Sequence, residues 1–367
     1  MAPSLADEVA PSLAPSLARR VGPRYANAVT RLTIGVMGAG SIGCFVGGKL
    51  LGADAADVVL VGRERLRSEL AQHGLSVKDF DEPAETLSPS AIRYETSPDA
   101  LADCEAVLVC VKSAQTEEVA ATLDGVLGED TVVASFQNGV RNPEVLRAAL
   151  GARPVVPAVV GFNVVSRGEG LFHRAMSGSL MLERVAHAEP LFEALERARL
   201  GVALYDDLAP EQWTKLMVNL NNAVSALSDA PSRQLLLSAG YRKIIAALVG
   251  EALAVLKRAQ IKPAKLRGVP VGLMPHVLKL PTALVKLVTR AQMRVDPEAR
   301  SSMWEDLTRG RPTEVDHLNG EIVRLAERVG AEAPLNRRVV ELVHAAEAAG
   351  AGSPKLDAEA LWAALTG

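Results

Sequence analysis

The sequence predicts an α/β fold, in which an N-terminal Rossmann-type, doubly wound sheet precedes a C-terminal all-α domain. Three observations predict it. Short apolar runs alternate with helical stretches in the first part of the chain, and the motif G-x-G-x-x-G follows the first run. From about residue 210 onward the pattern is almost wholly helical. Alternating strands and helices are typical of a parallel sheet that is covered on both faces.

The elements follow in order. Residues 1–31, with three copies of PSLA and no apolar block of the kind that a secretory signal needs, are expected to form a disordered tail. Residues 32–206 form the predicted Rossmann-type domain, with buried strands in 31–40, 57–63, 105–113 and 131–139. Helices are expected at 41–52 and 64–74, and strand-like pieces in 154–183 predict an antiparallel extension. The segment DDLAPEQW, 206–213, leads into the predicted helical substrate and catalytic domain, 207–367.

The composition gives no sign of a nucleic-acid partner, a membrane span or a metal site. The 367 residues suffice for about two domains, and the net charge of −3 gives no sign of a nucleic-acid partner. No run of 18 apolar residues is present, so no membrane span is expected. The three cysteines have a spacing that fits no metal site, and they indicate reduced thiols in a cytoplasmic protein.

The glycine motif predicts a dinucleotide site. Gly38 permits the tight turn, Gly40 lets the backbone approach a pyrophosphate, and Gly43 lets helix and strand pack closely. Ser41 and Ile42 begin the helix, whose N-terminal N–H groups suit an anion. The alternative is a tight turn without a ligand.

The residues at the end of the second predicted strand indicate which cofactor binds. An NAD-binding fold usually ends this strand in an acid that holds the ribose 2′-hydroxyl. Here Gly62 and Arg63 occupy that place, and a guanidinium suits a 2′-phosphate. We therefore expect NADP(H), although Glu64 supplies a nearby carboxylate and Arg63 could simply be solvated at a helix start.

A lysine and two amides share one face of a predicted helix in the stretch EQWTKLMVNLNNAVSAL. Lys215, Asn219 and Asn222 are spaced i, i+4 and i+7. The surrounding positions are apolar: Leu216, Met217, Leu220 and Ala223. A partly desolvated lysine is suited to donate a proton at neutral pH. The alternative is a solvated stripe.

Further along, Thr313 and Glu314 are expected to open a helix with the apolar stripe Val315, Leu318, Ile322 and Leu325. Glu314 could act chemically or only stabilise the helix dipole, and Ser301 and Ser302 could be ordinary hydroxyls at a helix start.

The segment 231–295 holds twelve Lys or Arg and one acid, Glu251. In it, a basic amphipathic helix is expected, with Lys279, Lys286, Arg290 and Arg294 opposite Leu280, Leu284, Leu287 and Ala291. We expect its apolar face to be core and its basic face to be solvated, and the alternative is a surface for membrane or nucleic acid.

Five motifs together resemble the ketopantoate reductase (2-dehydropantoate 2-reductase) family over most of residues 32–350. They are GAGSIG, VKSAQ with Lys112 and Gln115, QNG with Asn138, WTKLMVN with Lys215 and Asn219, and SSMWEDLTRGRPTEVDHLNG with Ser302 and Glu314. The resemblance implies an NADPH-binding domain, a helical domain and a substrate cleft between them, in an enzyme of pantothenate biosynthesis.

The resemblance also implies roles. Lys215 matches the general acid, Glu314 the carboxylate that works with it, and Asn138 an active-site asparagine near the nicotinamide. Ser302 matches a group for the substrate carboxylate, Lys112 and Gln115 line the cofactor cleft, and Arg63 matches the 2′-phosphate arginine. Asn219 and Asn222 are assigned to the substrate. Two positions depart from the family, because Ala223 and Ala299 stand where its best-known members have asparagines, and segment 265–297 resembles an insertion.

The predicted function is NADPH-dependent reduction of ketopantoate, a small 2-oxo acid, to pantoate with Lys215 as proton donor. One alternative is an NADP-dependent reductase of another 2-oxo acid on the same two-domain plan. The other is a non-catalytic protein that senses NADPH or docks on a membrane. No metal and no nucleic-acid partner are expected, and a homodimer is compatible with the family.

Overall fold

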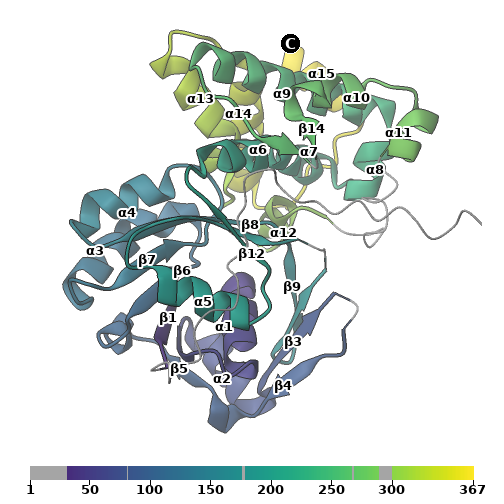
Figure 1. The fold of residues 1–367 in the computed structure, drawn as a ribbon. Helices are drawn as coiled ribbons and strands as arrows, with labels where there is room; N and C mark the ends of the chain where they lie inside the picture. Colours follow the sequence, from purple (N-terminus) through teal and green to yellow (C-terminus); the bar gives the residue numbers. More distant parts are fainter. Residues whose placement is uncertain (1–30, 81, 176–177, 267, 289–299) are drawn as a thin grey trace, which may run out of the picture.

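The structure is a computed structural model that describes residues 31–80, 82–175, 178–266, 268–288 and 300–367. It confirms the predicted fold class, because a Rossmann-type domain with a mainly parallel sheet carries a helical C-terminal domain on one side (Figure 1). The predicted tail lies outside the described residues except for Arg31, which pairs with Asp57 at 3.1 Å. The domain boundary at 206/207 stays a prediction, and it falls between the last strand and the first helix of the helical domain.

The main sheet orders its strands β12-β11-β8-β7-β6-β1-β2-β5 within the described residues. Their bounds are β1 (Thr33–Met37), β2 (Asp57–Val61), β5 (Arg93–Glu95), β6 (Ala106–Val109), β7 (Val132–Ser135), β8 (Val155–Val160), β11 (Leu180–Glu183) and β12 (Val202–Tyr205). The strands from β8 to β5 run parallel, whereas β11 pairs antiparallel with β8. The predicted antiparallel extension is therefore confirmed.

Helices cover both faces of this sheet, which explains why its strands read as continuous apolar runs. Successive side chains of a strand point to opposite faces, so Leu108 packs with α1 (Ser41–Gly52) and α5 (Glu189–Arg197). Val107 and Val109 pack with α3 (Thr116–Val126) and α4 (Asn142–Leu150) on the other face. Helix α2 (Glu64–His73) follows β2 at the sheet edge.

A second sheet, ordered β4-β3-β10-β9, was not expected from the sequence. Its strands are β3 (Leu75–Asp79), β4 (Glu85–Leu87), β9 (Val164–Gly168) and β10 (Leu171–Arg174). It packs against α1, where Phe172 and Phe45 belong to one buried cluster. Asp79 of β3 pairs with Lys49 of α1 and Arg174 of β10, so one carboxylate ties this sheet together.

The helical domain builds a separate apolar core around the long helix α9. Its helices are α6 (Ala209–Asn219), α7 (Asn221–Ser228), α8 (Ser232–Leu237), α9 (Ala239–Arg258), α10 (Met274–Leu278), α11 (Thr282–Val288), α12 (Ser302–Thr308), α13 (Asn319–Arg328), α14 (Pro334–Ala349) and α15 (Ala358–Thr366). Short 3-10 turns occur in both domains: η1 (Pro89–Ala91), η2 (Pro98–Leu101) and η3 (Ser113–Gln115) in the Rossmann-type domain, and η4 (Val271–Leu273) and η6 (Val315–His317) in the helical domain. The domain is not wholly helical, since β13 (Lys265–Leu266) and β14 (Val269–Pro270) pair as a small ribbon.

The predicted basic amphipathic helix is wrong as a continuous element. Pro281 separates α10 from α11, and a proline has no N–H with which to continue a helix. Helix α11 rests on the domain through the fully buried Val285, while Leu284 and Leu287 are 47% and 69% exposed. The expectation that these two leucines belong to the core is therefore wrong.

The remaining residues predicted for that helix beyond Val288, including Arg290, Ala291 and Arg294, lie outside the described residues. Among the described ones, Lys279 lies in the turn between the two helices. No helix in the described ranges is both long and apolar enough to cross a membrane.

Candidate active site

The glycine loop has the geometry that a dinucleotide site requires. Gly38 has φ +100°, and an added Cβ there would lie 2.7 Å from the backbone N of Val111. A Cβ on Gly43 would lie 2.6 Å from the Gly38 carbonyl oxygen, so this glycine lets α1 pack directly on the turn. A Cβ on Gly40 would meet no atom within 4 Å. The middle glycine therefore faces open space, as a position that a ligand approaches should.

The N-terminus of α1 is also open to a ligand. Ser41 and Ile42 form its first turn and are half-buried, and no side chain caps this end. The N–H groups of a first helical turn have no acceptor within their own helix, and the dipole is positive there. An anion such as a pyrophosphate fits this position.

The sheet topology places a switch point beside the loop. The strand order reverses between β1 and β6, and ligands of open parallel sheets bind at such a switch point, outside the carboxyl ends of the strands. Lys112 and Gln115 follow β6 directly, Lys112 half-buried and Gln115 exposed. The structure thus brings these two predicted residues to the edge of the sheet at which the glycine loop lies.

Position 62, directly after β2, leaves no room for a side chain. Any Cβ at Gly62 would overlap the hydroxyl oxygen of Tyr94, which donates a hydrogen bond to the carbonyl of Arg63 at 3.2 Å. Arg63 is exposed, and within the described residues its guanidinium makes no ion pair. Glu64 pairs with Arg67 at 3.3 Å along its own helix. The cation, rather than the carboxylate, is therefore available to a ligand here.

Lys215 leaves α6 and reaches the Rossmann-type domain. Its Nζ donates to the carbonyl oxygen of Val160, the last residue of β8, at 2.8 Å. Burial lowers the pKa of Lys215 to about 8, and the negative charge of Glu314 opposes this shift. The ammonium thus lies at the carboxyl edge of the sheet with a pKa near neutrality.

The predicted single helix around Lys215 is interrupted. Helix α6 ends at Asn219 and α7 begins at Asn221, with Leu220 between them. Asn219 and Asn222 are half-buried, and the neighbouring Ala223 is fully buried in the domain core. Side chains larger than alanine at 223 would have to enter this core, so the missing family asparagine lies at a packed position.

Glu314 reaches across the two domains. Its Oε1 accepts the backbone N–H of Ser113 at 3.3 Å and lies 3.2 Å from the Ser113 Oγ. Its Oε2 accepts from the Asn138 Nδ2 at 3.0 Å. Glu314 is only 8% exposed, and its direct partners are Ser113 and Asn138 rather than Lys215. The structure brings Glu314 and Asn138 together as one cluster.

The expected start of the helix at Glu314 is wrong. The 3-10 turn η6 follows Glu314, and α13 begins only at Asn319 because Leu318 has a non-helical backbone, with φ −114° and ψ −88°. The expected apolar stripe is nevertheless buried: Val315, Leu318, Ile322 and Leu325.

Lys112 also bridges the domains. Its ammonium forms an ion pair with Asp306 of α12 and donates to the carbonyl oxygen of Pro312 at 3.4 Å. Burial raises the pKa of the Asp306 carboxyl, and the Lys112 ammonium opposes that effect. The predicted cofactor-cleft lysine is thus held by an acid of the helical domain.

Ser302 is the first residue of α12 and is exposed. The neighbouring Ser301 caps the helix, because its Oγ accepts from the N–H of Trp304 at 3.1 Å. The same Oγ donates to the carbonyl oxygen of Asn222 at 3.0 Å. The predicted substrate residues Ser302 and Asn222 therefore lie on two helices that are joined at this point, whereas Ala299 lies outside the described residues.

Sequence reasoning missed Ser113 and Asp306. Ser113 is part of the motif VKSAQ, and Asp306 is part of SSMWED. Asp306 follows Ser302 by four residues, so Ser302 and Asp306 lie on one face of α12. Their partners belong to the other domain, a relation that spacing along the chain does not reveal. No cluster of three or more side chains suited to a metal occurs in the described ranges.

Two parts of the chain match models of one protein family. Residues 34–187 match the family model "Ketopantoate reductase PanE/ApbA", and residues 207–347 match "Ketopantoate reductase PanE/ApbA C terminal". The 2-dehydropantoate 2-reductase of Pyrococcus horikoshii is 29% identical over 88% of this chain and 100% of its own length. That of Pyrobaculum aerophilum is 31% identical over 65% of this chain and 76% of its own.

Solved structures resemble the fold. The PanE/ApbA family ketopantoate reductase from Ralstonia eutropha JMP134 has a TM-score of 0.74 and 29% identity, covering 87% of this chain and 99% of its own. A D-mandelate dehydrogenase solved with NADH has a TM-score of 0.69 at 21% identity over 87% and 99% of the two chains, which shows the fold alone.

Proposed function

The chain belongs to the ketopantoate reductase family, oxidoreductases that act on a CH–OH group, and from this we propose that it reduces 2-dehydropantoate to pantoate with NADPH. One observation carries the proposal. Lys215, whose pKa burial lowers to about 8, ends at the carboxyl edge of the sheet, the edge at which the glycine loop also lies. A proton donor and a dinucleotide site thus share one side of the molecule.

We assign the cofactor site to the glycine loop, the first turn of α1 and Arg63. Gly38, Gly40 and Gly43, with the N–H groups of Ser41 and Ile42, suit the pyrophosphate. Family membership gives the chain a nicotinamide cofactor, and the exposed Arg63 beside the blocked position 62 favours NADPH over NADH. The cofactor supplies the hydride when it is bound.

The acid–base work falls to side chains of the helical domain. Ser302 and the amides of Asn219 and Asn222 hold the 2-oxo acid with its keto oxygen toward Lys215. The Lys215 ammonium stabilises the alkoxide as it develops and gives it a proton. The Glu314 carboxylate keeps free lone pairs beyond its bonds to Ser113 and Asn138, and it accepts a hydrogen bond from a substrate hydroxyl.

Lys112 and Asn138 contact the helical domain, and Gln115 follows Lys112 in the same short segment after β6. Lys112 uses two of its three ammonium hydrogens on Asp306 and Pro312, which leaves one for a cofactor oxygen. Asn138 lies next to the Glu314 carboxylate, where it can contact both cofactor and substrate.

A different 2-oxo acid is the second candidate. The observation that favours it is the fully buried Ala223, which gives this chain no amide where well-known family members place one. A pocket with fewer hydrogen-bond donors discriminates less strongly for a substrate hydroxyl.

The test is NADPH oxidation by the full chain with ketopantoate, beside pyruvate, 2-oxoisovalerate and oxaloacetate, and with NADH as cofactor control. We expect the highest kcat/KM with ketopantoate and NADPH. Preference for another acid would favour the second candidate, and tight NADPH binding without turnover of any acid would contradict both.

A further inference from the structure

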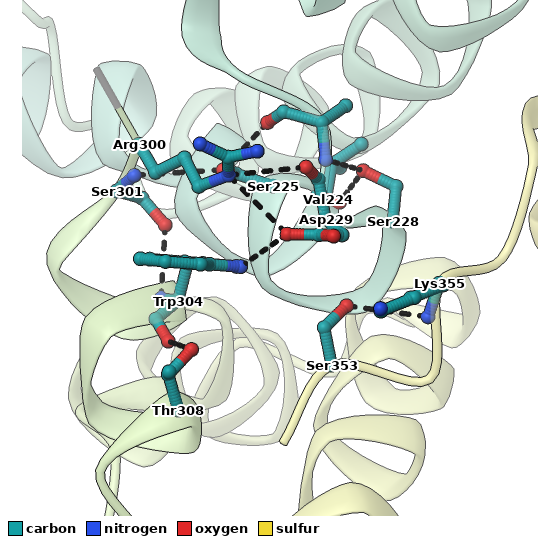
Figure 2. A network of polar contacts seen from close by, with 11 residues as sticks. Val224, Ser225, Ser228, Asp229, Arg300, Ser301, Trp304, Thr308, Ser353 and Lys355 are labelled. Carbon is teal, nitrogen blue, oxygen red and sulfur yellow. Dashed lines mark hydrogen bonds and ion pairs between the residues drawn. The ribbon is translucent and has the colours of Figure 1, made fainter. Parts of the chain in front are cut away.

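Asp229 joins helices α7 and α12 at the edge of the candidate site. It follows the last residue of α7 with φ +59°, a left-handed conformation that Asp tolerates better than most residues. Its Oδ1 accepts from the Trp304 indole Nε1 at 2.7 Å and from the Arg300 Nε at 3.2 Å (Figure 2). Its backbone carbonyl accepts from the same Nε at 3.2 Å. One residue therefore holds two side chains that flank the start of α12.

These two side chains also contact each other. The Arg300 guanidinium carbon lies 4.8 Å from the centre of the Trp304 ring, so cation and ring stack. Arg300, Ser301, Ser302 and Trp304 are nearly consecutive, and holding the outer two fixes the pair of serines between them. The stacked pair thus acts as a bracket around Ser302.

The turn that carries Asp229 is itself braced. The Ser228 Oγ donates to the Val224 carbonyl at 2.6 Å and accepts the N–H of Ala230 at 3.2 Å. The Ser225 Oγ donates to the Ala230 carbonyl at 3.0 Å. Figure 2 shows Val224, Ser225 and Ser228 close to Asp229. These hydrogen bonds hold the turn, and with it the Asp229 carboxylate, in one position. The carboxylate in turn fixes the position of α12.

Helix α12 depends on such anchors because it has only seven residues. A helix this short is marginal on its own, so its position follows from its tertiary contacts. It carries Ser302, assigned to the substrate, and Asp306, the partner of Lys112.

We propose that Asp229 is a positioning residue for the substrate side of the site: through Arg300 and Trp304 it holds the first turn of α12, so that Ser301 keeps its hydrogen bond to Asn222 and Ser302 keeps its place at the start of the helix. The proposal rests on the proposed function. It predicts that loss of the acceptor oxygen of Asp229 raises the KM for the 2-oxo acid about tenfold, the scale of one buried hydrogen bond. The KM for NADPH should change less than about twofold.

Three variants separate this role from a structural one. Asp229→Gly removes the carboxylate while suiting the left-handed backbone. Asp229→Asn keeps an acceptor for the indole and should recover most of the wild-type KM. Trp304→Phe keeps a ring but removes the donor, and it should reproduce the effect of Asp229→Gly. The double variant should be no worse than either single variant if the two residues act as one unit.

Backbone hydrogen exchange over residues 300–308 gives a second readout that needs no substrate. Faster exchange confined to this segment in Asp229→Gly, with a raised 2-oxo acid KM, supports the proposal. Unchanged exchange and unchanged KM would overturn it, as would an equal rise in both KM values. If the wild type reduces no 2-oxo acid, the proposed function fails, and the exchange result alone then decides whether Asp229 positions α12.

Discussion

Lys215 connects packing to chemistry at the scale of one residue. It leaves α6 of the helical domain, and its ammonium ends on the Val160 carbonyl of the Rossmann-type domain. Burial lowers its pKa to about 8, so the protonated fraction of the folded protein falls as the pH rises through that value. A donor of a proton must carry one, whereas the reverse reaction needs the neutral amine.

We therefore predict that kcat for reduction falls as pH rises through about 8, and that kcat for alcohol oxidation rises over the same range. Lys215→Met should lower kcat for reduction by about 10²–10⁴-fold, the usual contribution of a positioned acid. Steady-state rates across pH measure both effects. Lys355→Met, at an exposed lysine far along the chain, is the control, and equal losses in the two variants would contradict the assignment.

Arg63 and Arg65 offer a matched pair for the cofactor. Arg65 pairs with Glu69 at 2.8 Å, whereas Arg63 makes no ion pair within the described chain. We predict that Arg63→Ala raises the KM for NADPH by about 10–100-fold, as loss of a charge-assisted contact should, and leaves that for NADH almost unchanged. Arg65→Ala should change neither. Equal losses with NADPH and NADH would place the 2′-phosphate elsewhere.

The glycine loop allows a prediction at the scale of an element. A Cβ at position 40 meets open space, while one at 43 meets the Gly38 carbonyl at 2.6 Å. Gly40→Ala should therefore keep the melting temperature and weaken NADPH binding, because the methyl group occupies ligand space. Gly43→Ala should lower the melting temperature as well, since α1 must move away from β1. Thermal unfolding and NADPH titration measure the two effects, and a large loss of stability in Gly40→Ala would show that the space is not open.

The parallel strands and their helices could be predicted because apolar runs and the glycine motif are local signals. Strands β3 and β4 could not, since they are short and partly polar, and β3 pairs with β10 almost a hundred residues later. The predicted long basic helix is interrupted at Pro281. Proline is itself a local signal against a continuous helix, whereas the spacing of the basic residues favoured one. Exposure of Leu284 and Leu287 depends on what α11 packs against, which the sequence does not state.

The candidate site belongs to the whole molecule, because its polar groups are paired across the domains. Motifs identified Glu314, Asn138 and Lys112 one by one, but not that Ser113 binds Glu314 or that Asp306 binds Lys112. Such pairs depend on how the two domains are arranged. Lys112 and Ser113 are adjacent, so one short segment after β6 holds two acids of the helical domain. The domain contact and the candidate site are thus built by the same residues.

The two side chains of the Lys112–Asp306 ion pair differ in solvent exposure, and this difference gives a prediction about stability. The Asp306 side chain is 9% exposed and that of Lys112 is 38% exposed. Removing the lysine leaves a buried carboxylate without its cation, whereas removing the acid leaves an ammonium that water can reach. We predict that Lys112→Met costs about 2 kcal/mol of unfolding free energy at neutral pH, a value below that of a fully buried pair because Lys112 is partly solvated. Asp306→Asn should cost clearly less.

The stability of Lys112→Met should also depend on pH. Burial raises the pKa of Asp306, and without Lys112 nothing opposes that effect, so the folded state of Lys112→Met binds a proton more readily than the unfolded state. Its stability deficit relative to wild type should therefore shrink as pH falls from neutrality toward the ordinary carboxyl range, and the double variant Lys112→Met/Asp306→Asn should recover most of the loss at neutral pH. Denaturant unfolding of the cofactor-free protein at several pH values measures this. A deficit that stays constant with pH, or a double variant as unstable as the two losses added together, would mean that the two domains are not held by this pair.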